Sequence, residues 1–194
     1  MRPAVFLDRD GVLNELVRDP YSGNPESPLD PDEVTLIPGA AAALRRLRDA
    51  GYVLVAVSNQ PAAAKGVVPI ERLESIQERV LELLTQEAAA PDAFRTCLHH
   101  PDGVVPELTG ACECRKPAPG MLLDAASELG LDLGASWMIG DTDDDVTAGS
   151  AAGCRTVLVE NPGSAHKRHG DARPDATASD LASAADVIVD MGKR

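Results

Sequence analysis

The stretch AVFLDRDGVLNEL, residues 4–16, starts with four apolar residues and then changes abruptly into acidic and polar sequence. An apolar run without alternation is typical of a short strand that is covered on both faces. In open parallel sheets, ligands bind beyond the carboxyl ends of the strands. The stretch therefore predicts a buried parallel strand over residues 4–7 that presents Asp8 and Asp10 at a candidate site.

Short apolar runs alternate with helical patterns along most of the chain. The other expected strands are residues 52–57, 94–98, 137–139, 156–159 and 187–189. Apolar residues at three-to-four spacing, acidic first turns and terminal glycines indicate helices between these runs. The expected helices are residues 39–50, 70–89, 120–129 and 143–152. This alternation predicts an α/β fold, with a doubly wound, Rossmann-like parallel sheet and helices on both faces.

Two stretches interrupt the alternation. Residues 19–33 hold four prolines and few apolar side chains, which predicts a long loop, and loops of this length often cover a site. Residues 99–120 form a second irregular segment, and the polar segment 161–180 predicts no particular element. A length of 194 residues suits a single domain over residues 1–194.

The composition limits the possible partners. With 18 Lys and Arg against 31 Asp and Glu, the net charge is −13, and a field of this sign repels nucleic acids. No apolar run approaches the ~20 residues that a membrane-spanning helix needs. A small anionic metabolite remains a possible partner where local cations or a bound metal reverse the field.

The cysteines and the N-terminus indicate a cytoplasmic protein. Three of the four cysteines lie between residues 97 and 114, which is not the pattern of a disulfide framework. The apolar stretch near the N-terminus is too short for a secretory signal. The low aromatic content, 3 %, favours a monomer.

Polar and reactive residues follow several of the expected strands. Asp141 follows the strand at 137–139 and Ser58 follows the strand at 52–57, while Lys116 precedes a helix. Because converging carboxylates need a cation between them, Asp8, Asp10 and Asp141 predict a Mg²⁺ site. The Ser58 hydroxyl and the Lys116 ammonium are donors that a phosphoryl group requires.

Each of these short motifs also has a purely structural interpretation. A single Asp-x-Asp after a strand is most often a solvated turn, and a Ser-Asn pair simply favours turns. The acidic run at 141–145 could be only the start of a helix. Their shared position at strand ends or helix starts favours a common phosphoryl-transfer site with an Asp nucleophile.

Four segments together resemble the motifs of the haloacid-dehalogenase (HAD) superfamily of phosphatases. They are Asp8-Arg9-Asp10-Gly11-Val12-Leu13-Asn14, Ser58-Asn59-Gln60, Cys114-Arg115-Lys116-Pro117 and Gly140-Asp141 through Asp145. The resemblance implies that Asp8 becomes an aspartyl-phosphate and that Asp10 is the general acid and base. It also implies that Asp8, Asp141 and the Asp10 carbonyl bind Mg²⁺, and that Asp145 steadies Lys116 or the metal shell. The residues expected to bind the phosphorylated substrate are Arg9, Ser58, Asn59, Arg115 and Lys116.

A second metal site is predicted by the spacing of three cysteines and a histidine. Cys97-x-His99 is followed after twelve residues by Cys112-x-Cys114, and tetrahedral Zn²⁺ accepts such a set in structural sites. His99 is preferred to His100 because one-residue spacing places Cys97 and His99 on the same side of an extended segment. The alternative is a set of free thiols with a Cys112–Cys114 redox pair, and Cys154 is expected in the core.

This zinc loop, residues 97–114, resembles a branch of the HAD phosphatases with a minimal cap. The branch includes D-glycero-D-manno-heptose-1,7-bisphosphate 7-phosphatases, which the loop resembles more, and histidinol-phosphate phosphatases. Histidinol phosphate or another small sugar phosphate therefore remains an alternative substrate, and a catalytically idle zinc-clipped binding protein an alternative of another class. The chain departs from the heptose pattern at Thr142, where a lysine is common, at 61–66 (PAAAKG) and in the long flap loop 19–33.

Overall fold

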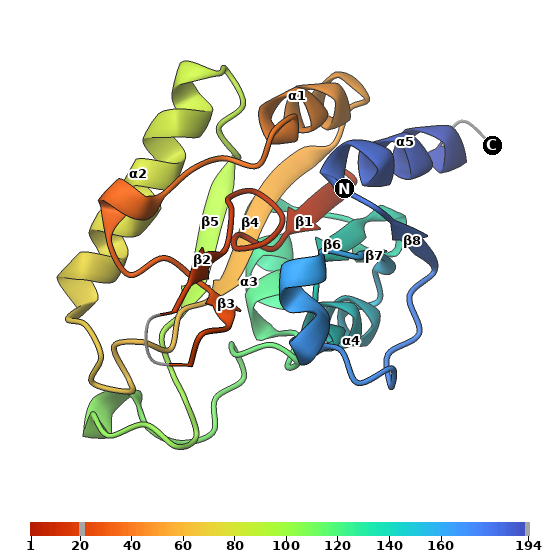
Figure 1. Ribbon diagram of the computed structural model, residues 1–194. Helices are drawn as coiled ribbons and strands as arrows, with labels where there is room; N and C mark the ends of the chain where they lie inside the picture. The colour runs from red at the N-terminus through yellow and green to blue at the C-terminus, as the bar shows by residue number, and fades with distance from the viewer. Residues whose placement is uncertain (20–21, 193–194) are drawn as a thin grey trace.

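The computed structural model describes residues 1–19 and 22–192, and at its centre is a six-stranded parallel sheet (Figure 1). The order of the strands is β5-β4-β1-β6-β7-β8. Their bounds are β1 (Ala4–Leu7), β4 (Val53–Asn59), β5 (Ala93–Cys97), β6 (Trp137–Gly140), β7 (Arg155–Val159) and β8 (Ala176–Ala178). After β1, the chain adds β4 and β5 on one side of it and then β6, β7 and β8 on the other side. The strand order therefore reverses at β1. Ligands bind at such a reversal in doubly wound folds, and the predicted fold class is confirmed.

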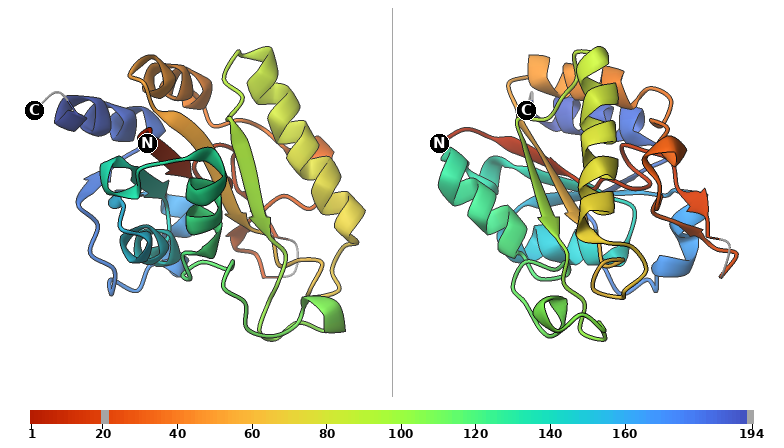
Figure 2. Two further views of the ribbon diagram at one scale, coloured as in Figure 1. Left: turned by 180° about the vertical axis from the view of Figure 1, so that it is seen from behind. Right: turned by 90° about the vertical axis from the view of Figure 1, so that its left-hand side faces the viewer.

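In the part of the chain that the structure describes, five α-helices cover the sheet. They lie on both of its faces (Figure 2). One face carries α1 (Ala40–Asp49), α2 (Ile70–Gln86) and α5 (Leu181–Gly192), and the other carries α3 (Gly120–Leu129) and α4 (Asp143–Ala152). Successive residues of a strand point to opposite faces. Accordingly Val5 packs in the first layer and Phe6 in the second, and both are fully buried. The uniform apolar character of β1 follows from this double coverage.

Helix α4 lies unusually close to the sheet because its buried face carries small residues. A Cβ atom at Gly149 would lie 2.5 Å from the Cβ of Met138 and 2.8 Å from Cγ2 of Thr156. A larger residue at position 149 would therefore push the helix away from β6. This close packing fixes the start of α4, which carries the acidic residues of the candidate site.

The prediction of a strand at residues 187–189 is wrong, because these residues belong to helix α5. Leu181, Ala184 and Ile188 are buried at helical spacing, and this stripe outweighs the strand preference of three β-branched residues. The outer strand is instead β8, in the segment for which the sequence predicted no element. Within the described residues, no helix has both the length and the apolar character needed to cross a membrane.

The expected loop at 19–33 is more ordered than a plain loop, although its residues 20–21 lie outside the described residues. Strands β2 (Val17–Arg18) and β3 (Pro25–Glu26) form an antiparallel hairpin. The remaining short elements are η1 (Pro31–Glu33), η2 (Pro106–Leu108), η3 (Leu133–Ala135) and η4 (Pro162–Lys167). Glu26 accepts a hydrogen bond of 2.6 Å from Lys167, so η4 is tied to strand β3 of the hairpin.

Candidate active site and metal centre

The carboxyl ends of three neighbouring strands bring Asp8, Ser58 and Asp141 to one edge of the sheet. Strand β1 lies between β4 and β6, and Leu7 pairs with Ala56 on one side and with Ile139 on the other. A cleft of about 990 Å³ opens at this edge, lined by Asp8, Asp141 and Lys116 and by the β2–β3 hairpin. The residues assigned to a common site in the sequence therefore meet in space.

Lys116 is the cation at the centre of the site. Its Nζ donates hydrogen bonds of 2.8 Å to Asp8 Oδ1 and to the Val57 carbonyl, and it forms an ion pair of 2.6 Å with Asp145 Oδ1. Burial alone would lower the pKa of Lys116, but the Asp145 and Asp8 carboxylates raise it above its usual value. Lys116 is therefore a fixed ammonium that can face a phosphoryl group.

Three carboxylates surround a position that fits a divalent cation. Oxygens of Asp8, Asp141 and Asp145 lie within 4.8 Å of one another, and the Asp8 side chain is only 13 % exposed. Burial and the neighbouring Asp145 raise the pKa of Asp8 to about 7, and burial and Asp8 raise the pKa of Asp141 well above its usual value. Asp141 Oδ1 is buried without a hydrogen-bond partner among the described residues. A small cation would relieve both features, so these residues fit Mg²⁺.

The Asp10 carboxylate lies outside this group of three. It accepts hydrogen bonds from Arg9 Nε at 3.1 Å, Asn14 Nδ2 at 2.9 Å, Gln60 Nε2 at 2.5 Å and Ser27 Oγ at 2.9 Å. The expectation that the carboxylates of Asp8, Asp10 and Asp141 converge is therefore wrong for Asp10, because these donors turn its carboxylate away. Only its backbone carbonyl stays a predicted magnesium ligand.

The donors around Asp10 also control its protonation. Burial would raise the pKa of Asp10, but the Arg9 guanidinium and the hydrogen bonds of Asn14 and Gln60 lower it. Arg9 is 1 % exposed and paired with Asp10, so in this structure it orients the carboxylate. Gln60 also donates to Ser58 Oγ at 2.8 Å. The sequence flagged Gln60 only as part of a motif, and its position two residues after Ser58 was the available signal.

Asn59 holds the backbone of Lys116 in place. Its Nδ2 donates to the Lys116 carbonyl at 2.9 Å, and its Oδ1 accepts from the Lys116 amide at 3.1 Å. Both ends of the amide are engaged, so in this structure Asn59 links β4 to the segment that carries Lys116. Ser58 is 2 % exposed, and its hydroxyl oxygen accepts the hydrogen bond from Gln60.

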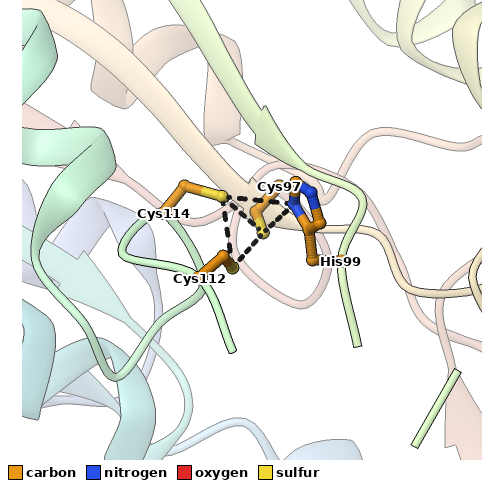
Figure 3. A group of neighbouring side chains, drawn as sticks. All are labelled: Cys97, His99, Cys112 and Cys114. Atoms are coloured by element: carbon orange, nitrogen blue, oxygen red, sulfur yellow. Dashed lines mark hydrogen bonds between the residues drawn. The ribbon is translucent and has the colours of Figure 1, made fainter. Parts of the chain in front are cut away.

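Three cysteines and a histidine form a compact cluster (Figure 3). The Sγ atoms of Cys97 and Cys112 are 3.6 Å apart, those of Cys112 and Cys114 3.4 Å, and those of Cys97 and Cys114 2.9 Å. His99 Nδ1 lies 3.7 Å from Cys97 Sγ and 3.6 Å from Cys114 Sγ. Tetrahedral ligands held about 2.3 Å from a metal are roughly 3.8 Å apart. Four of these five distances are close to that value and the Cys97–Cys114 distance is shorter. The cysteines are not in disulfides, so all four side chains are free to bind one metal ion.

His99 and not His100 faces this cluster, as the residue spacing predicts. His100 Nδ1 accepts instead from the backbone amide of Asp102 at 3.1 Å. Cys154 lies outside the cluster and is buried in the core, as expected, and burial raises the pKa of its thiol to about 12.

The cysteine cluster is tied to the wall of the cleft. Arg115 Nη1 donates to the His99 carbonyl at 3.2 Å, and the Val104 amide donates to the Ala64 carbonyl at 2.7 Å. Lys65 and Arg115 both line the cleft. Burial lowers the pKa of His100, and the charges of Lys65 and Arg115 lower it further, which places both cations near the His100 ring. The cleft thus holds the cations Lys65 and Arg115 in addition to Lys116.

The parallel sheet, the Asp8 and Asp10 pair after its central strand, and the buried Lys116 define a phosphatase of the HAD class. The HAD-hydrolase-like family model matches residues 113–184. A D-glycero-beta-D-manno-heptose-1,7-bisphosphate 7-phosphatase of Yersinia pestis is 38 % identical over 180 residues, covering 93 % of this chain and 92 % of that protein. A D-glycero-D-manno-heptose-1,7-bisphosphate 7-phosphatase of Thermosynechococcus vestitus is 40 % identical, covering 96 % and 95 %.

A solved structure supports the same conclusion. The D,D-heptose 1,7-bisphosphate phosphatase of B. bronchiseptica, complexed with magnesium and phosphate, is 30 % identical with a TM-score of 0.80, and the match covers 97 % of this chain and 99 % of that one. The chain belongs to the D-glycero-D-manno-heptose-1,7-bisphosphate 7-phosphatase family of HAD hydrolases. It is a phosphatase, which removes the alternative of a catalytically idle binding protein.

Proposed function

We propose that this phosphatase removes the 7-phosphate of D-glycero-D-manno-heptose 1,7-bisphosphate in a Mg²⁺-dependent reaction. The observation that carries the proposal is the arrangement of positive charge in the cleft. Lys116 lies beside Asp8, and two further cations, Lys65 and Arg115, line the same cleft. Cations beyond the one at Asp8 suit a sugar that carries a second phosphate. The substrates named for the relatives agree with this arrangement.

Asp8 and Asp10 divide the chemistry between them. An Asp8 carboxylate oxygen attacks phosphorus, the bond from phosphorus to the sugar oxygen breaks, and Asp10 donates a proton to the departing alkoxide. Because its neighbours lower the pKa of Asp10 in the free protein, Asp10 must first take up this proton when the anionic substrate binds. In the second half, Asp10 takes a proton from a water molecule that attacks the aspartyl-phosphate, and phosphate leaves while Asp8 is regenerated. Ser58 and Lys116 hold the transferring phosphoryl group, and Arg9 and Gln60 keep the Asp10 carboxyl in position.

The metal ligands are proposed from the carboxylates and thiols described above. Asp8, Asp141 and the Asp10 carbonyl would hold Mg²⁺, which neutralises charge on the phosphoryl oxygens when it is bound. Cys97, His99, Cys112 and Cys114 would hold a structural Zn²⁺. The zinc loop 97–114 has few core residues, so metal binding would supply order that packing does not.

Substrate selection in this proposal depends on the 1-phosphate, which is distal to the 7-phosphate that is removed. Lys65 and Arg115 would pair with the 1-phosphate, and both are anchored through the loops that the cysteine cluster holds together. Acidic residues also line the cleft, namely Asp19, Glu26 and Glu33. They would suit the amine of histidinol phosphate, so this substrate belongs in any test.

The deciding experiment measures phosphate release from a panel of substrates with Mg²⁺. The panel holds both anomers of the heptose bisphosphate, heptose 7-phosphate, histidinol phosphate and a 3′-phosphorylated oligonucleotide. We expect the highest kcat/KM for one anomer of the bisphosphate, and a lower value for heptose 7-phosphate, which lacks the distal phosphate. A preference for histidinol phosphate or for the oligonucleotide would contradict the proposal.

We further propose a single domain over residues 1–194 that works as a monomer in the cytoplasm. Two core clusters share one sheet, and the free thiols of the cysteine cluster suit a reducing compartment. Size-exclusion chromatography with light scattering tests the oligomeric state.

A further inference from the structure

The turn from Asn161 to Arg168 lies outside the motifs of the family resemblance and yet contacts the proposed magnesium ligand Asp141. Ser164, in η4, is 1 % exposed, and its Oγ donates a hydrogen bond to Asp141 Oδ2. The other carboxylate oxygen, Asp141 Oδ1, has no hydrogen-bond partner among the described residues. The two oxygens of Asp141 are therefore unequal, because one is held by the turn and the other is left for another ligand.

Gly11 lies against Asp141 Oδ2, the oxygen that accepts the hydrogen bond from Ser164. A Cβ atom at Gly11 would lie 2.0 Å from Asp141 Oδ2, so no other residue fits there without moving Asp141. Gly11 also has a φ of 84°, which other residues rarely adopt. The backbone of the first motif thus lies directly against the oxygen that accepts from Ser164.

The turn is fastened to both motifs that it touches. Arg168 Nη1 donates to the Asp141 carbonyl at 3.0 Å and to the Asn161 carbonyl at 2.9 Å. Asn161 Nδ2 donates to the Gly11 carbonyl at 2.9 Å, and Asn161 Oδ1 accepts from the Gly163 amide at 2.9 Å. Ser164 therefore sits on a short segment whose position relative to Asp141 is set from both ends.

We propose that Ser164 is a positioning residue, which holds Asp141 Oδ2 so that Oδ1 is directed toward the divalent cation. A carboxylate without this hydrogen bond can rotate about its χ2 angle, so that neither oxygen is held in the direction of the cation. Hydrogen bonds to ligating side chains orient them, and losing such a partner typically weakens metal binding about 10- to 100-fold. The proposal rests on the magnesium site of the proposed function.

The test measures cation binding without substrate. Mn²⁺ serves as the probe, and free Mn²⁺ is followed by electron paramagnetic resonance, with Mg²⁺ added as a competitor. For Ser164→Ala we expect affinity for the active-site cation to fall about 10-fold or more, with thermal unfolding close to wild type. Ser164→Thr keeps the hydroxyl and should bind close to wild type. Ser150→Ala, which changes an exposed serine at the far end of α4, should bind as wild type does.

The outcomes separate this proposal from the proposed function. Asp141→Asn identifies the active-site cation by its loss. If wild type binds that cation and Ser164→Ala binds it equally well, the positioning role is wrong while the magnesium site stands. If wild type binds no cation that Asp141→Asn removes, both proposals fail. A second readout is activity, because excess Mg²⁺ should restore the kcat of Ser164→Ala, and a kcat that stays low at saturating Mg²⁺ would also count against a role in metal positioning.

Discussion

Lys116 Nζ and Asp145 Oδ1 form a buried ion pair of 2.6 Å, which joins the loop after β5 to the first turn of α4. Asp145 also accepts hydrogen bonds from the amide and the hydroxyl of Thr142, at 3.1 and 2.6 Å, and so caps the helix. Of the two roles that the family resemblance offered Asp145, the structure shows contact with Lys116 and also places the carboxylate among the group of three. The Asp145 side chain thus orients the Lys116 ammonium.

Replacing Asp145 by asparagine should therefore lower the free energy of unfolding. Breaking a buried pair leaves the other charge uncompensated and costs about 3 kcal/mol, here reduced by the remaining contact between Lys116 and Asp8. Urea denaturation measures the change. Asp144→Asn is the control, since Asp144 is exposed on the same turn and should change stability by no more than about 0.5 kcal/mol. Equal effects of the two variants would show that the pair contributes little.

Asp8→Asn should abolish turnover without loss of the fold. An amide cannot form the acyl-phosphate bond, so phosphate release should fall by at least about a thousandfold, while circular dichroism stays as in wild type. Rapid-quench labelling of the wild type with a radioactive substrate should place the label on Asp8. Near-normal activity of Asp8→Asn, or a label on another residue, would rule out this nucleophile.

Cys112→Ser tests the cysteine cluster. Freshly purified, reduced wild type should contain about one zinc per chain, and the variant much less, as measured by elemental analysis. Because Arg115 bonds the His99 carbonyl, the variant should also have a higher KM for the bisphosphate. Cys154→Ala, which changes the cysteine outside the cluster, should keep its zinc. A wild type without zinc would contradict the assignment.

Removing the cations on the cleft wall should change selectivity more than chemistry. For Lys65→Ala and Arg115→Ala, kcat/KM for the heptose bisphosphate should fall about 10- to 100-fold, the effect of losing a charge-assisted contact. The value for heptose 7-phosphate should change little, because that substrate lacks the distal phosphate. Arg72→Ala is a matched control, since Arg72 is half-exposed and pairs with Asp30. A parallel loss on both substrates would place these cations at the reaction centre.

Asp180 should stabilise the start of α5 in a pH-dependent way. It accepts from the Ser183 amide at 2.7 Å, and this contact lowers the pKa of Asp180. A lowered folded-state pKa means that the stabilisation is present at neutral pH and is lost as the pH falls through the usual aspartate range, near 3.9, and below it. Asp180→Ala should cost about 1 kcal/mol at pH 7 and less in acid, as measured by urea denaturation. Asp171→Ala, at another exposed acid, is the control and should change stability at pH 7 by no more than about 0.5 kcal/mol.

Several features were predictable from the sequence because they depend on neighbours along the chain. The apolar run at 4–7 has no polar position that could face water, so it had to be a covered strand, and Asp8 had to emerge at its end. The short spacings Cys97-x-His99 and Cys112-x-Cys114 each set two ligands on one side of an extended segment. These local patterns were sufficient to predict the fold class, the four members of the cysteine–histidine cluster, and Asp8 and Asp141 in the acidic site.

Only the tertiary structure decided how those residues face one another. Asp145 belongs to the group of three carboxylates and pairs with Lys116. The Asp10 carboxylate lies outside this group and is held by the Arg9, Asn14 and Gln60 donors. Ser164 meets Asp141 from a segment that showed no motif. Residues 187–189 form a helix because a buried stripe that begins at Leu181 extends through them. In each case, contacts between distant segments select one side-chain direction or one element among the several that the local sequence permits.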